Sequence, residues 1–101
     1  MNFEEFSASV ETEPSPPEGL SPELRALWLA KNDQWHESHE VVNDIHSKMG
    51  SWIHAHLHLI EGDTGNAAYW YHRANVPAKR DPSEIPAEWE ELVKANLGSQ
   101  G

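Results

Sequence analysis

The 101-residue chain contains no cysteine, so a disulfide is excluded as a source of stability. A folding unit of about 75 to 80 residues has a thin core and often needs a metal or a partner chain. Large aromatic side chains offset this in part, because each buries much apolar area. Five of them are tryptophans: Trp28, Trp35, Trp52, Trp70 and Trp89.

Basic residues are also scarce. Seven Lys and Arg stand against 17 Asp and Glu, which gives a net charge of −10. A phosphate backbone or an anionic membrane surface would repel such a chain, whereas cations would be attracted. No apolar run approaches the ~20 residues of a membrane span, and the N-terminus shows no signal-peptide pattern. We therefore expect no nucleic acid or membrane partner, and a cytoplasmic protein.

The first nineteen residues have little apolar material. They are acidic, rich in Ser and Thr, and contain Pro14, Pro16 and Pro17. Such a composition cannot bury enough apolar surface to offset the entropy of ordering. The sequence predicts a disordered segment over 1–19 and a single all-α domain over 20–98.

Helix start and stop signals divide that domain into five short helices. Ser21 and Asp63 are good N-caps, and Gly50 and Gly62 are typical helix ends. Apolar spacing then predicts helices over about 22–31, 34–48, between Ser51 and Gly62, 64–75 and 86–97. Most connections are two to four residues long, so neighbouring helices should form antiparallel hairpins.

The stretch 51–60 fits two patterns. Its histidines at 54, 56 and 58 alternate with apolar residues, which is a strand period. Read as a helix, it has an apolar arc opposite a stripe of His54, His58 and Glu61. We favour the helix, because no second strand offers a pairing partner for the backbone.

The His54, His58 and Glu61 stripe has the composition of a two-histidine, one-carboxylate metal site. If helix 34–48 turns back near Gly50, His36 and Glu40 lie at about the same axial height. These five residues could meet around Zn, Fe, Mn or Ni. The alternatives are that the stripe is a solvated helix face, or that it serves acid–base catalysis without a metal.

Two further residues on helix 34–48 could act beside such an ion. Glu37 and His39 are candidates for an acid or base on metal-bound water, or for ordering the ligands. The spacing of His36 and His39 is i, i+3, so this segment does not have the i, i+4 histidines of zinc proteases.

The block Glu61-Gly62-Asp63-Thr64-Gly65-Asn66-Ala67-Ala68-Tyr69-Trp70-Tyr71-His72-Arg73-Ala74 resembles one helix of a tetratricopeptide-type repeat. The resemblance implies that its Ala and Trp-Tyr positions pack on the preceding helix. No second copy occurs at a 34-residue spacing, which excludes a repeat array.

A second resemblance extends over about 34–77. The segment Trp35-His36-Glu37-Ser38-His39-Glu40, Trp52-Ile53-His54 with His58, and the block 61–74 together resemble an uncharacterised family of small, mainly bacterial helical proteins. The resemblance implies no reaction. An aromatic usually stands where this chain has His56, which implies a packing role for that residue.

These features favour a protein-binding or self-associating module as the function. The alternative is a transition-metal-binding protein or metal-dependent enzyme that uses the His and Glu residues. A third interpretation is a pH-responsive protein, because histidines titrate near pH ~6.5. The sequence specifies no substrate, reaction, partner or oligomeric state.

Overall fold

A computed structural model describes residues 1–100 of the chain. Helices are the only regular elements in this part, which confirms the predicted all-α class. Six α-helices and one short 3₁₀ helix follow in order: α1 Phe3–Thr12, α2 Pro22–Lys31, α3 Trp35–Asn43, α4 Lys48–Glu61, α5 Thr64–Ala74, η1 Pro82–Glu84 and α6 Ile85–Gln100. None of the described helices has the length and apolar character needed to cross a bilayer.

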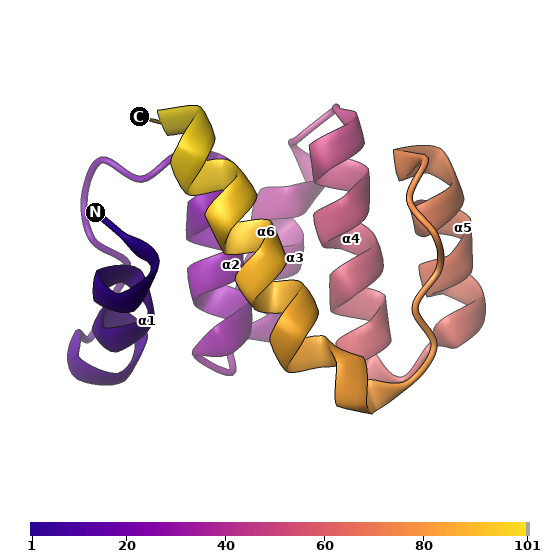
Figure 1. Ribbon diagram of the computed structural model, residues 1–101, viewed down its shortest axis with the longest axis horizontal. Helices are drawn as coiled ribbons and strands as arrows, with labels where there is room; N and C mark the ends of the chain where they lie inside the picture. The colour runs from indigo at the N-terminus through magenta and orange to yellow at the C-terminus, as the bar shows by residue number, and fades with distance from the viewer. Residues whose placement is uncertain (101) are drawn as a thin grey trace.

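The helices pack around α2 and α4. Figure 1 shows α4 and α5 side by side as a hairpin, with α2 and α3 next to them. The last helix, α6, lies obliquely across α2 and α4, and α1 closes the far end of the molecule near both termini. This arrangement leaves α4 in contact with α2, α3, α5 and α6, so its whole circumference is available for buried side chains.

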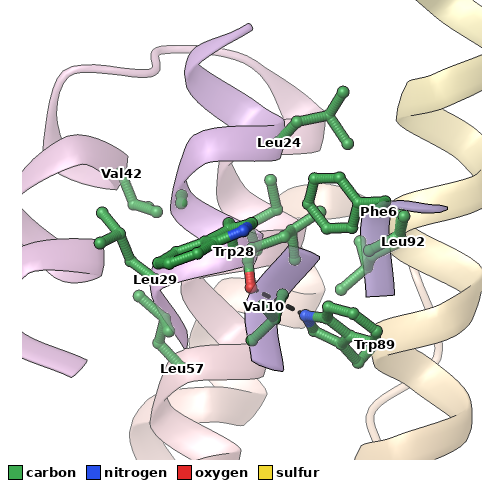
Figure 2. Packing of buried hydrophobic residues seen from close by; sticks show 13 residues of the cluster. Phe6, Val10, Leu24, Trp28, Leu29, Val42, Leu57, Trp89 and Leu92 are labelled. Carbon is green, nitrogen blue, oxygen red and sulfur yellow. Dashed lines mark hydrogen bonds between the residues drawn. The ribbon is translucent and has the colours of Figure 1, made fainter. Parts of the chain in front are cut away.

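The larger core cluster lies where α1, α2, α4 and α6 meet. Figure 2 shows Phe6, Trp28, Leu57 and Trp89 among its members. The indole nitrogen of Trp89 donates a hydrogen bond of 2.8 Å to the carbonyl of Leu27 (Figure 2), so this polar atom is satisfied inside the core.

Helix α1 corrects the prediction of disorder over the first nineteen residues. Asn2 and Glu5 form a capping box at its start. Phe6 is fully buried and Val10 nearly so, both in the core cluster that contains Trp89. Trp28 also donates to the hydroxyl of Ser9 at 3.0 Å. The segment is ordered because the rest of the protein covers its short apolar face.

The boundary between α3 and α4 also differs from the prediction. Helix α3 ends at Asn43, and Ser47 caps α4, so Gly50 lies in the first turn of α4 rather than ending a helix. A Cβ at this glycine would lie 2.3 Å from the carbonyl oxygen of Ile45. Glycine is therefore required at this position because the preceding turn lies against the helix, and it does not mark a stop.

The turn between α4 and α5 has the helix end and the N-cap that the sequence predicts. Gly62 adopts the left-handed conformation, with φ of 86°, and Asp63 accepts a hydrogen bond from the backbone of Asn66. Ala67 and Tyr71 of α5 are buried in the second core cluster, which also contains residues of α4. The small alanine lets the two helices approach closely and fixes the side of α4 that faces α5.

Candidate functional site

Helix α3 is fixed in rotation by two buried hydrogen bonds. The indole nitrogen of Trp35 donates to the carbonyl of Leu57 at 2.7 Å, and the hydroxyl of Ser38 donates to the carbonyl of Ala26 at 2.7 Å. Residues 35, 38, 39 and 42 share a helix face at this spacing. The face that carries His39 is consequently turned toward α4.

Three imidazoles meet between α3 and α4. Nε2 of His39 and Nε2 of His54 lie 3.1 Å apart, and the rings of His54 and His58 stack with centroids 5.0 Å apart. One nitrogen from each of the three residues lies within 4.8 Å of the other two. Two ligands of a tetrahedral zinc ion lie about 3.4 Å apart at ordinary bond lengths. The spacing of the three nitrogens therefore suits one ion.

Tryptophans flank this histidine cluster on two sides. The ring of Trp70 stacks on His54 at 3.8 Å with an interplanar angle of 8°, and Trp35 stacks on His39 at 4.9 Å and 12°. Stacking against large rings restricts the rotation of the imidazoles. The two rings are thus held with their nitrogens near each other before any ligand arrives.

The carboxylate of Glu61 orients the third histidine. Its Oε1 lies 2.6 Å from Nδ1 of His58, so the Nδ1–H group donates to the carboxylate and Nε2 is left as the free nitrogen. Metal-binding histidines usually donate their other N–H group in this way. His58 and Glu61 also form a second close group with Asp63, whose side chain is exposed.

Two of the clustered histidines resist protonation. Burial, together with the nearby His39 and His58, lowers the pKa of His54 to about 4. The pKa of His39 is lowered by burial and by His58, although Glu61 opposes the shift. Both rings are therefore neutral at pH 7, the form in which imidazole binds a metal.

The proposed ligands divide into two sets. The structure brings His54, His58 and Glu61 together, as their spacing on one helix predicts. His36 and Glu40 are exposed and belong to neither group of close ligand atoms in the described residues. Glu40 lines a cavity with Pro16 and Arg25, and none of the three clustered histidines lines that cavity. The predicted ligands His36 and Glu40 therefore contribute no atom to the cluster of His39, His54 and His58 in the described residues.

On α3, the residue that lies next to His54 and His58 is His39. It was a candidate for a supporting role, together with Glu37, which is exposed and lines the same cavity as Glu40. The signal for His39 was in the sequence: it follows Trp35 by four residues and precedes Val42 by three, so it shares their inward face. The height of a residue along the helix axis does not show which neighbouring helix its side chain faces.

The alternative of a solvated stripe is wrong for the two α4 histidines. His54 is 7 % exposed and His58 is 6 % exposed, because α3 and α5 cover them. Only Glu61 lies at the surface, with 41 % of its side chain exposed.

A second polar cluster lies on the opposite side of α4, and sequence reasoning missed its centre. Glu88 of α6 is fully buried. It accepts hydrogen bonds from Nδ1 of His56 at 2.7 Å, from Tyr71 at 2.8 Å and from the indole of Trp52 at 3.2 Å. The sequence of an amphipathic helix does not show which of its glutamates will be buried against neighbouring helices.

Donors around Glu88 decide its ionisation. Burial on its own would raise the pKa of this carboxyl, but the hydrogen bond and charge of His56, with hydrogen bonds from Tyr71 and Trp52, outweigh it and lower the pKa. The pKa of Tyr71 is raised by burial and by its bond to Glu88. The cluster therefore holds an ionised carboxylate and a neutral phenol in the core.

Comparison with known proteins adds no relative: no family model, curated protein or solved structure matches the chain.

Proposed function

We propose that this protein binds one divalent transition metal ion through His39, His54 and His58, with zinc as the best match. The observation that carries the proposal is the convergence of three imidazole nitrogens within 4.8 Å of one another from two helices. Nitrogen ligands suit zinc, and three protein ligands leave a fourth position for water or a small ligand.

The surroundings of the histidine cluster support the same function. Glu61 fixes the ring of His58, and Trp70 fixes the ring of His54, so little side-chain entropy remains to be lost on binding. A cavity of about 410 Å³ is lined in part by His54 and Trp70, which brings open space up to one of the three histidines.

Metal titration tests the proposal. The purified chain, stripped with a chelator, is titrated with Zn²⁺ while the total tryptophan fluorescence and the melting temperature are followed. We expect saturation at one equivalent and a higher melting temperature, because an ion that binds only the folded state stabilises it. Elemental analysis after dialysis should find one zinc per chain.

Matched variants locate the site. His39→Ala and His54→Ala should each abolish stoichiometric binding, and Glu61→Gln should weaken it about 10- to 100-fold. His36→Ala and Glu40→Ala should bind as the parent does, as should His72→Ala, whose histidine is exposed on α5. Binding that survives His39→Ala and disappears with His36→Ala would contradict the assignment.

The protein-binding or self-associating module predicted from the sequence stays a prediction, and it has less support than metal binding. Large apolar side chains with more than a third of their surface exposed are Met1, Ile60 and Tyr69 in the described part of the chain. Met1 precedes α1, Ile60 lies in α4 and Tyr69 lies in α5, so the three do not share one element. Light scattering against protein concentration measures self-association directly.

A further inference from the structure

The cavity of about 410 Å³ has positively charged side chains in its wall. Lys48 begins α4, Arg73 lies in the last turn of α5, and both exposed side chains line this space. Figure 1 shows the start of α4 and the end of α5 at the same end of their hairpin. No described Asp or Glu belongs to the wall, although the chain contains 17 acidic residues. The cavity is therefore a locally positive site on an acidic protein.

Neither of these cations is neutralised within the described part of the chain. The ion pairs found there involve His56, His58 and Lys94 as the basic partners, and not Lys48 or Arg73. Both positive charges are consequently available to an anionic ligand in the cavity. Lys and Arg side chains keep their charge at neutral pH, so this availability does not depend on the titration of a histidine.

The guanidinium of Arg73 is held in place by two aromatic residues. It donates a hydrogen bond of 3.1 Å from Nη1 to the hydroxyl of Tyr69, and it lies 5.2 Å from the centre of the Trp70 ring. Most of its N–H groups have no partner among the described residues. A guanidinium with free N–H groups binds the oxygens of a phosphate or carboxylate through two parallel hydrogen bonds.

Ser51 adds an unpaired hydroxyl to the wall. The residue lies in α4, one turn after Lys48, and is only 9 % exposed. Its hydroxyl makes no hydrogen bond with another described residue, although it lines the cavity. A buried hydroxyl without a partner costs free energy, and a ligand oxygen in the cavity would remove that cost. The side chains of Asn43 and Ser47 also line the space and offer further donors.

The charge and size of the cavity narrow the choice of ligand. A phosphate monoester carries a charge of about −1.5 to −2 at pH 7 and three strong acceptor oxygens, which suits two cations and several neutral donors. A carboxylate has one charge and two oxygens. The volume lies in the range of about 300–1,000 Å³ that is typical of small-molecule sites, so there is room for more than a phosphate group. Ile45 and Trp70 supply apolar surface in the same wall.

We propose that this cavity binds a small organic phosphate. The guanidinium of Arg73 and the ammonium group of Lys48 bind the phosphate oxygens, and Ser51 donates its hydroxyl to one of them. The organic part lies against Trp70 and Ile45. None of the phosphate-binding groups belongs to the histidine cluster, so the proposal does not rest on zinc binding.

Three probes test the proposal in the metal-free protein. Phenyl phosphate, inorganic phosphate and benzoate are titrated separately into the chelator-treated chain at about pH 7.5 and constant ionic strength, with calorimetry to measure affinity. We expect saturable binding of phenyl phosphate, with inorganic phosphate about tenfold weaker because it lacks the apolar contact. Benzoate keeps the ring but has the smaller charge, and should also bind about tenfold more weakly. Backbone amide NMR signals of Ser51 and Arg73 should shift on binding.

Variants of equal charge locate the site. Arg73→Gln and Lys48→Gln should each weaken the binding of phenyl phosphate about tenfold or more, since each removes a charge-assisted hydrogen bond. Arg80→Gln removes one positive charge from an exposed residue outside the cavity wall and should leave the affinity unchanged. All three residues are exposed, so the variants should fold. No saturable binding of phenyl phosphate, equal affinity for phenyl phosphate and benzoate, or equal weakening by Arg80→Gln and Arg73→Gln would overturn the proposal.

Discussion

At the scale of single residues, the environment of each histidine decides its chemistry. Spacing along α4 was enough to predict that His54 and His58 share a face with Glu61. It could not identify their partner on α3, because the rotation of that helix is set by long-range bonds of Trp35 and Ser38. The burial of Glu88 could not be predicted either, since its hydrogen-bond donors come from other helices, α4 and α5.

His54 should make the metal-free protein sensitive to acid. The unfolded chain protonates this residue near pH 6.5, whereas the folded protein keeps it neutral until about pH 4. Between these values the unfolded state binds more protons, so the free energy of unfolding falls as the pH falls. The loss should be on the order of 3 kcal/mol between pH 7 and pH 4.

Urea unfolding in the presence of a chelator measures this dependence. His54→Gln lacks the titrating group, so its curve of stability against pH should be flatter than that of the parent over this range. His46→Gln, at an exposed histidine, is the control and should keep the parental slope. Parallel curves for the parent and His54→Gln would contradict the prediction.

Glu88 should contribute strongly to stability. Glu88→Gln removes the charge that pairs with His56 and leaves buried donors poorly matched, so we expect a loss of about 3 kcal/mol in guanidinium unfolding. Glu90→Gln, on the same helix, breaks a pair with Lys94 whose side chains are 46 % and 57 % exposed. That control should leave stability almost unchanged, because water and salt screen an exposed pair. Equal losses for the two variants would show that the core cluster is not intact.

At the scale of helices, local chemistry predicted most ends correctly. Ser21, Gly62 and Asp63 act as caps in the structure because capping involves groups within one turn. Helix α1 was missed because average composition hid the helical spacing of Phe3, Phe6 and Val10, whose burial depends on distant partners. The error at Gly50 also arises from a contact outside the helix, because the nearby Ile45 precedes α4.

Gly50→Ala tests this interpretation of the α3–α4 turn. Alanine normally favours a helix, but here its Cβ would lie 2.3 Å from the backbone oxygen of Ile45. We expect a destabilisation of about 2 kcal/mol from the forced shift. Gly98→Ala, in α6 with open space around the Cβ, should instead be neutral or stabilising by a few tenths of a kcal/mol. Chemical denaturation of both variants gives the comparison, and a stabilised Gly50→Ala would contradict the turn geometry.

At the scale of the whole molecule, α4 separates the histidine cluster from the polar cluster around Glu88. The histidine cluster lies beside a cavity of about 410 Å³ that His54 lines in part, whereas Glu88 is fully buried in the core. Both are embedded in a chain with a net charge of −10. The excess of negative charge attracts cations to the protein. The acidic side chains also repel one another within the folded state.

Self-repulsion should make stability increase with salt. At pH 7.5, raising NaCl from about 0.01 M to about 0.15 M shortens the screening length from about 30 Å to about 8 Å. The structure extends 33 × 23 × 22 Å, so repulsion between its opposite sides is then largely screened and the melting temperature should rise. The increment should shrink toward zero near pH 5, where the sequence is close to its isoelectric point of about 5.0. Calorimetry in the presence of a chelator measures both increments. A melting temperature that falls with salt at pH 7.5 would mean that attractive pairs, rather than net charge, dominate the electrostatics of this fold.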